Sequence, residues 1–232
     1  MERIKQLAYM LEKYKNKDNA VQMEKYMKNH FPFLGIKTPT RREVTKAFFQ
    51  ESGILKEDFQ PEFVIKLWEQ REREYQNIAL DYIERSLKKV EKSHLPLMEQ
   101  LITTKPWWDT VDMLAQKPVG KIATEFPEVV EDTIEQWAIG ENMWLRRSAI
   151  LYQLKYKERT NEEKLSLYII ENVSSKEFFI QKAIGWALRE YSKTNPDFVK
   201  AFIEDNALPK LSIREGSKYL NEIDIHINLM SE

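Results

Sequence analysis

Hydrophobic residues recur along this chain at intervals of three and four, the spacing that gathers them on one face of an α-helix. Segments 63–68 and 74–83 show the pattern in succession and predict two amphipathic helices. Segments 144–152 and 179–188 show it again further along. The 232 residues include six glycines and nine prolines, fewer than a β-protein with many turns would need. The pattern therefore predicts an all-α fold.

Small residues recur with a period near 35 within the predicted helices. Ala79, Ala115, Ala149, Ala183 and Gly216 are separated by 36, 34, 34 and 33 residues. A small residue in mid-helix lets a neighbouring helix approach closely, and this period suits a helix pair with its turns. Helix pairs that cannot bury their apolar faces alone stack on one another. We therefore predict a HEAT-like helical-repeat solenoid, an α-α superhelix with a concave face, formed by residues 1–232 as a single domain.

Prolines and one irregular stretch mark the expected breaks between helices. Residues 31–40 form the one long irregular segment near the start and are expected to link an N-terminal helix pair to the repeats. Proline is favoured in the first turn of a helix, where its missing N–H would have no partner. We expect helices to begin just after Lys105-Pro106, Lys117-Pro118, Phe126-Pro127 and Asn195-Pro196.

The composition excludes several kinds of site. Without cysteine, the chain has no disulfide, thiolate metal site or cysteine nucleophile. The three histidines, His30, His94 and His226, are far apart, so we expect no metal and no cofactor. The glycine-rich motifs of dinucleotide sites and P-loops and the GxSxG motif of α/β-hydrolases are also missing. No apolar stretch is long enough for a membrane span or a signal peptide, so we expect a soluble, cytoplasmic protein.

Charge is sorted along the chain although the formal net charge is −1. Residues 1–60 hold 12 Lys or Arg against 8 Asp or Glu, and all charged residues of 125–135 are acidic. The following segment, 146–159, is strongly basic. Any affinity for nucleic acid must therefore come from basic residues gathered on one face. Ordinary solvated helix faces would account for the same sorting.

The segment 107–112, Trp-Trp-Asp-Thr-Val-Asp, contains the strongest candidate for chemistry. If a helix begins near Pro106, Trp108 and Asp112 lie one turn apart on the same face. An aromatic ring face attracts cations, and a carboxylate shielded from water stabilises a developing positive charge. Cleavage of an N-glycosidic bond develops such a charge on the sugar, as in glycoside hydrolysis.

Each of these residues also has a structural interpretation. Trp107, Trp108 and Trp186 could belong to the core, Asp109 and Asp112 could cap a helix or pair with arginine, and Arg146 and Arg147 could be solvated. The repeat favours the functional interpretation, because Asp112, Arg147 and Trp186 fall in corresponding helices of three successive repeats. They could therefore meet on one surface.

At these residues the sequence resembles the AlkD-type bacterial DNA alkylation repair glycosylases over nearly its whole length. The resemblance is carried by five strings, residues 26–31, 34–39, 107–112, 144–157 and 174–191. It implies helical repeats that wrap duplex DNA and release cationic alkylated purines, chiefly N3-alkyladenine and N7-alkylguanine, by hydrolysis. It also implies action without a conventional pocket for a flipped base.

The resemblance also implies roles for single residues. Asp112 corresponds to the catalytic carboxylate, Trp108 and Trp186 to the aromatic pair that flanks it, and Arg147 to an arginine that contacts DNA at the site. The remaining DNA-contacting residues implied by the matching strings are Tyr26, Lys37, Thr38, Arg42 and Arg189.

We therefore expect a DNA-alkylpurine N-glycosylase of base excision repair, a monomer whose partner is double-stranded DNA containing alkylated purines. We expect it in the bacterial cytoplasm, on the nucleoid when it is bound to DNA. Two alternatives remain open. One is a non-catalytic member of the same fold that binds bent or branched DNA, and the other is a helical scaffold for protein interactions.

Overall fold

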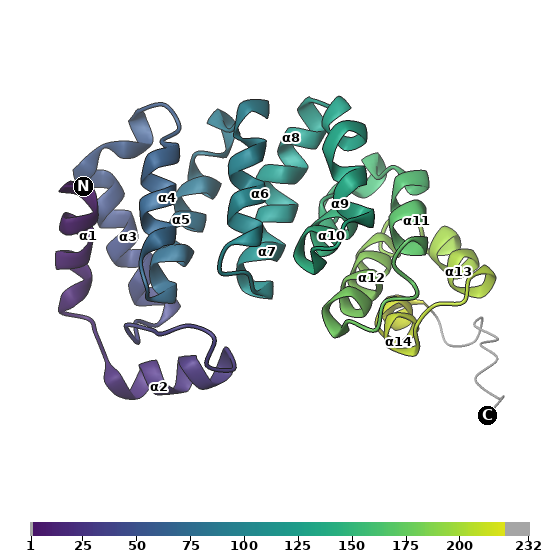
Figure 1. Cartoon of the computed structure of the whole chain (residues 1–232), viewed down its shortest axis with the longest axis horizontal. Coiled ribbons are helices and arrows are strands. Elements are labelled where there is room, and N and C mark those ends of the chain that lie inside the picture. The colour runs from purple at the N-terminus through teal and green to yellow at the C-terminus, as the bar shows by residue number, and fades with distance from the viewer. Residues whose placement is uncertain (1, 221–232) are drawn as a thin grey trace. The chain divides into compact units, whose positions relative to one another are not determined.

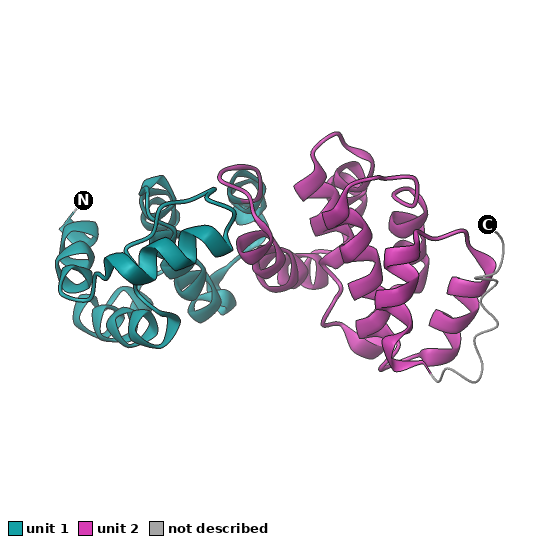
Figure 2. Cartoon of the chain, turned by 90° about the horizontal axis from the view of Figure 1, so that it is seen from below, with its two compact units in different colours: residues 1–101 teal, residues 102–232 magenta. Residues whose placement is uncertain are grey.

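The computed structural model describes residues 2–220, and within that range it contains helices and no strand, as predicted (Figure 1). The contacts divide the chain into two compact units, residues 1–101 and 102–232 (Figure 2). Each unit is described below by itself. The expectation that residues 1–232 form a single domain stays a prediction.

Unit 1 contains an N-terminal helix pair and the first repeats. Its helices are α1 (Glu2–Glu12), α2 (Lys17–Tyr26), α3 (Thr38–Ser52), α4 (Pro61–Glu69), α5 (Arg73–Arg85) and α6 (Leu95–Thr103), whose last two residues are counted with unit 2. The expected irregular stretch is present as an extended segment between α2 and α3. α4 and α5 form the first predicted amphipathic pair, with Ala79 fully buried.

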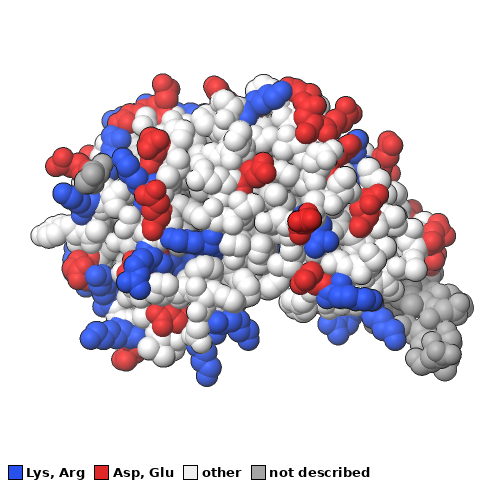
Figure 3. Space-filling view, viewed as in Figure 1, with Lys and Arg blue, Asp and Glu red and all other residues white. Residues whose placement is uncertain are grey.

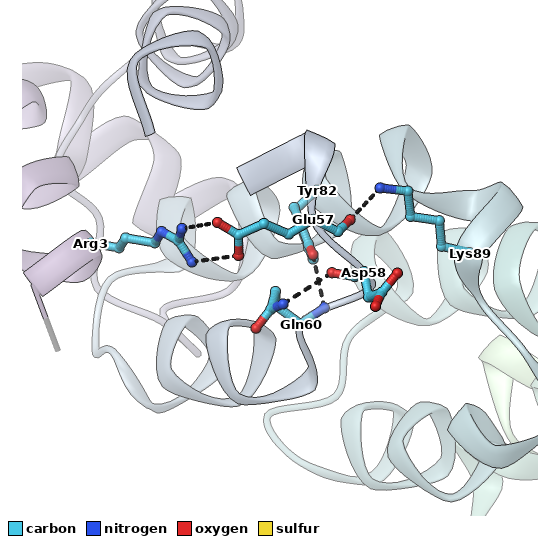
Figure 4. A network of polar contacts seen from close by, with 6 residues as sticks. All are labelled: Arg3, Glu57, Asp58, Gln60, Tyr82 and Lys89. Carbon is cyan, nitrogen blue, oxygen red and sulfur yellow. Dashed lines mark hydrogen bonds and ion pairs between the residues drawn. The ribbon is translucent and has the colours of Figure 1, made fainter. Parts of the chain in front are cut away.

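A polar network fixes α1 against the segment that connects α3 to α4 (Figure 4). Arg3 of α1 forms an ion pair with Glu57, and the Gln60 backbone N–H donates to the Tyr82 hydroxyl of α5 at 2.9 Å. Lys89 donates to the backbone carbonyl of Glu57 from the other side. The connecting segment is therefore held from three helical elements of unit 1.

Unit 2 continues the helix pairs. Its helices are α7 (Trp108–Leu114), α8 (Gly120–Glu125), α9 (Glu135–Ile139), α10 (Met143–Leu151), α11 (Glu162–Ile170), α12 (Phe178–Tyr191), α13 (Pro196–Asp205) and α14 (Lys210–Gly216). Ala115, Ala149 and Ala183 are at most 1% exposed. A Cβ added to Gly216 of α14 would lie 3.1 Å from Leu188 Cβ of α12. Small residues therefore do mark close approaches between helices.

One proline departs from the prediction. Pro118 does not precede a helix but lies inside a π-helical turn, Ala115–Val119, that joins α7 to α8 without a break. The wider turn is closed by the Gly120 N–H, which donates to the Ala115 carbonyl five residues back. Because proline lacks an N–H and its ring crowds the preceding turn, a locally widened helix accommodates it where a regular one would not. The other three proline pairs do precede helices, and Asn195 caps α13 by accepting from the Phe198 N–H.

Candidate active site

The segment 107–112 places Trp108 and Asp112 on one face of α7. Pro106 precedes the helix, Trp107 is its N-cap residue, and Trp108 is its first residue. Trp108 and Asp112 are therefore one turn apart, and both line the same cleft. This confirms the shared face that was predicted from their spacing.

Asp112 is held by a buried arginine from the neighbouring repeat. Arg147 of α10 donates from Nε to Asp112 Oδ1 at 2.7 Å and from Nη2 to Oδ2 at 2.9 Å. A third bond runs from Arg147 Nη1 to the backbone carbonyl of Phe179 in α12. Arg147 is 4% exposed, so it is not the solvated surface charge that its sequence context also allowed. Three helices thus meet at one guanidinium group.

Burial raises the pKa of Asp112 above its usual value, and the hydrogen bonds and charge of Arg147 oppose the rise. The bidentate ion pair favours the ionised carboxylate. Because each carboxylate oxygen has more than one acceptor position, Arg147 does not exhaust the capacity of Asp112 to accept.

An aromatic cluster that includes Phe179 packs next to the ion pair of Arg147 and Asp112. The Trp107 ring centroid lies 5.8 Å from that of Trp144 and 5.0 Å from that of Phe179. The Trp144 and Phe179 centroids are also 5.0 Å apart, within the range of favourable aromatic pairs. Trp107 is therefore a packing residue, as one of the two interpretations proposed. Its neighbour Trp108 is half-buried and lines the cleft.

The cleft, about 520 Å³ in volume, brings five of the predicted residues together in unit 2. Trp108 and Asp112 come from α7, Arg147 from α10, and Trp186 and Arg189 from α12. Trp186 is half-buried, so part of its ring faces the open space. The lining is completed by Phe178, Phe179, Lys182, Glu215 and Lys218. It carries four basic and two acidic side chains, and so an excess of positive charge beside the aromatic rings.

The sequence reasoning missed Glu215 and the two lysines beside it. Glu215 of α14 pairs with Lys218 at 2.7 Å, Lys182 at 3.1 Å and Arg189 at 3.2 Å, and the contacts with Lys218 and Lys182 lower its pKa to about 2. A usable signal was present in the repeat. Lys182 and Glu215 are 33 residues apart, which is also the separation of Ala183 and Gly216.

The other predicted DNA-contacting residues lie in unit 1 and do not line this cleft. Tyr26, the last residue of α2, is 69% exposed. Lys37 is the N-cap residue of α3, Thr38 is its first residue, and both are exposed. Arg42 lies further along α3 and lines a separate small cleft with Asp81. Lys37, Thr38 and Arg42 thus lie in the first two turns at the amino end of α3, where Lys37 provides no side-chain cap.

A buried carboxylate fixes the segment that leads to α3. Glu74 of α5 is fully buried and accepts from the backbone N–H groups of Leu34, Gly35 and Ile36 at 2.9 to 3.0 Å. Gly35 has a φ of +81°, and a Cβ there would lie 1.9 Å from the Asn16 backbone oxygen. Glycine is therefore required where this segment passes the start of α2, and the amino end of α3 is held in place.

Charged side chains are unevenly spread over the face shown in Figure 3. In unit 2, acidic side chains are frequent along the upper edge near α8 and α9, and basic ones gather at the lower edge near α12 and α14. In unit 1, basic side chains gather around α2. Each unit therefore has a basic region, although the formal net charge of the chain is −1.

Residues 2–220 contain neither a cluster of metal ligands nor a membrane-spanning helix. No group of three or more His, Cys, Asp or Glu is arranged to hold a metal ion in this part of the chain. No helix there is both long and apolar enough to cross a bilayer.

The chain is similar to known proteins in both fold and sequence. The helical fold is similar to that of a solved structure described as a predicted DNA alkylation repair enzyme from Enterococcus faecalis. That match has 35% sequence identity and a TM-score of 0.80, and it covers 90% of this chain and 97% of the other. The model of the family described as DNA alkylation repair enzyme matches residues 7–220, and no curated protein matches. The chain belongs to the DNA alkylation repair enzyme family.

Proposed function

We propose that this protein is a DNA N-glycosylase that hydrolyses the N-glycosidic bond of cationic alkylated purines, N3-alkyladenine and N7-alkylguanine, in duplex DNA. Family membership supports a role in the repair of alkylated DNA. The observation that carries the finer proposal is the half-buried carboxylate of Asp112, which shares a cleft of excess positive charge with Trp108 and Trp186.

The proposed chemistry follows from where charge develops in the reaction. As the bond breaks, the deoxyribose gains positive charge, which the Asp112 carboxylate stabilises most strongly where water is scarce. The faces of Trp108 and Trp186 add cation–π attraction to the same sugar. A cationic purine leaves as a neutral base, so the leaving group needs no proton donor.

Arg147 keeps the carboxylate ionised and oriented for this task. Its bidentate hydrogen bonds fix both Asp112 oxygens, and its third bond ties the pair to α12. A carboxylate oxygen that accepts from arginine has a further acceptor position for the O–H of an attacking water. A contact between Arg147 and a phosphate stays a prediction, because most of its donors serve Asp112 and Phe179.

Binding to the duplex would rest mainly on phosphate contacts. In unit 2 the basic side chains beside the cleft, Arg189 among them, support this. In unit 1 the exposed Lys37, Thr38 and Arg42 lie at the amino end of a 15-residue helix, whose dipole favours an anion. Tyr26 is exposed at the end of α2. We expect no metal or cofactor to take part, and a monomer to suffice.

Release of 7-methylguanine from methylated duplex DNA tests the catalytic assignment. Asp112→Asn removes the charge and keeps the shape, and we expect release to slow by about 100-fold or more. Asp109→Asn is the matched control, because it removes a carboxylate of the same helix that does not line the cleft. Equal rates for wild type and Asp112→Asn would refute the assignment. Duplex binding without release by the wild type would favour the non-catalytic DNA-binding alternative, and the absence of duplex binding would favour a protein scaffold.

Trp186 is tested separately because a tryptophan in an apolar helix could serve only the core. We expect Trp186→Ala to impair release in a folded protein, and Trp186→Phe, which keeps an aromatic face, to recover part of the rate. A lower melting temperature with unchanged release would restore the structural interpretation.

A further inference from the structure

The cleft contains a second charged group that the chemistry above does not use. Glu215 is 7% exposed, and its carboxylate contacts the side chains of Lys182, Arg189 and Lys218. The cations come from α12 and from the turn after α14. Their side chains are 36%, 27% and 47% exposed, so each is partly open to solvent while the carboxylate is not.

The backbone fixes where this carboxylate can lie. A Cβ on Gly185 would be 2.6 Å from Glu215 Cβ and 3.0 Å from the Ser212 carbonyl oxygen, so α14 packs directly on the backbone of α12. The Ser212 hydroxyl donates to the Gln181 carbonyl at 2.8 Å and joins the same two helices. Glu215 is therefore anchored, and the long, flexible cationic side chains converge on it.

The charges of this cluster do not cancel. One carboxylate faces three cations, which leaves an excess of positive charge at the edge of the cleft. Ammonium and guanidinium groups carry more N–H donors than their single bonds to Glu215 use. Donors in excess of one carboxylate, held together and partly exposed, suit a second anion, and a DNA phosphodiester is the anion that a duplex in this cleft would bring.

We propose that Lys182, Arg189 and Lys218 form a phosphodiester-binding subsite beside Asp112, and that Glu215 is the positioning residue that holds the three cations together. This rests on the proposed function for the identity of the anion. It adds that the cations act as one preorganised group rather than as separate surface charges.

The salt dependence of binding to an undamaged duplex tests the subsite. Each phosphate contact contributes about 0.9 to the slope of log K against log salt concentration. We expect Lys182→Gln and Lys218→Gln each to lower the slope by up to about 0.9, and the double variant to lower it by about 0.9 in total, because the cations share one phosphodiester. Lys164→Gln is the matched control, because Lys164 also pairs with a carboxylate, Glu135, but does not line the cleft. Slopes equal to that of the control would overturn the proposal.

The variant Glu215→Gln distinguishes two roles of Glu215, holding the three cations in place and only reducing their net charge. Removing a negative charge near a polyanion should strengthen binding if Glu215 only opposes the cations. If it positions them, binding to the duplex should weaken by about tenfold, the equivalent of about 1.4 kcal/mol, although the net charge rises by one. Glu215→Asp keeps the charge and should recover part of the affinity. Tighter binding by Glu215→Gln in a folded protein would overturn the positioning role.

Two controls keep the outcomes separate. Far-UV circular dichroism and urea unfolding check that the Glu215 variants fold, and the lysine variants, altered at exposed side chains, carry the test if they do not. Because binding is measured on undamaged DNA, the two proposals can fail separately. If the lysine variants show the expected slopes but the protein releases no base, the glycosylase proposal is refuted and the subsite proposal is not.

Discussion

Replacing Arg147 with methionine should expose how much of unit 2 depends on one ion pair. Methionine keeps an unbranched apolar stem but removes the guanidinium group. Asp112 then loses both of its hydrogen bonds to that group, and the Phe179 carbonyl loses the bond from Nη1. The carboxylate remains half-buried beside an apolar side chain.

The structure allows the cost to be worked out roughly. Breaking a buried ion pair by removing one partner costs about 3–5 kcal/mol, because the other charge stays buried. The Asp112 side chain is 13% exposed and lines an open cleft, so water recovers part of that cost. The lower end of the range applies, and we expect the free energy of unfolding to fall by about 3 kcal/mol. Asp112→Asn in the same chain should restore about 2 kcal/mol, because it removes the stranded charge.

The pKa of Asp112 determines how the cost of Arg147→Met changes with pH. Burial already raises the pKa of Asp112, and Arg147 opposes the rise, so the variant should raise this pKa further. A carboxyl whose pKa is higher in the folded state favours folding when protonated, and that stability is lost as the pH rises through the folded pKa. Arg147→Met should therefore be less destabilising at pH 4.5 than at pH 7.5.

Urea unfolding of wild type, Arg147→Met, Asp112→Asn and the double variant at these two pH values measures both effects. A cycle in which the two substitutions add without coupling, or a cost that does not change with pH, would show that Asp112 is not a stranded charge when Arg147 is absent. In that case the ion pair could not be what holds the carboxylate ionised.

Three further predictions concern the glycine at position 35, the hydrogen bonds of Glu74 to the segment before α3, and stability at low pH. Gly35→Ala should cost more than about 2 kcal/mol, because the added Cβ would overlap the Asn16 carbonyl. Gly53→Ala should cost only about 1 kcal/mol, because an added Cβ there would have no heavy atom within 4 Å although φ is +65°. Thermal unfolding compares the two variants. Glu74→Gln should cost about 2–3 kcal/mol in urea unfolding, because an amide cannot accept all three backbone N–H groups as the carboxylate does, and a loss below 0.5 kcal/mol would contradict this. The pKa of Glu215 is lowered from 4.5 to about 2, so its contribution is present above about pH 4.5 and is lost as the pH falls toward 2; with partly exposed partners we expect about 1–2 kcal/mol, absent from Glu215→Gln.

The helices and their repeat could be predicted because both produce regular spacings of residues along the sequence. Apolar periodicity gave the helix pairs, and the spacing of small residues marked the close approaches, including Gly216 against Leu188. Pro118 was the exception, because a proline in sequence indicates a break and the π turn that accommodates it depends on the helix continuing on both sides. The face shared by Trp108 and Asp112 followed from four-residue spacing alone.

The partners of the site residues could not be predicted from local patterns. Nothing near Arg147 indicates that it is buried against Asp112, and Glu215 carries no motif. Both contacts join helices one repeat apart, 35 residues for Asp112 and Arg147 and 33 for Lys182 and Glu215. The period of the small residues also separates the members of both charge pairs.

The ion pairs between repeats also set where the chain can be shortened. In repeat proteins each unit contacts only its neighbours, so the effect of removing one unit is largely confined to the next. Here a chain that ends after α11 would take the Phe179 carbonyl away from Arg147, and one that ends after α13 would take Glu215 away from Lys182 and Arg189. Helices α12 and α14 are thus joined to the cleft by a hydrogen bond and by ion pairs, and we expect removal of either helix to destabilise the rest of unit 2.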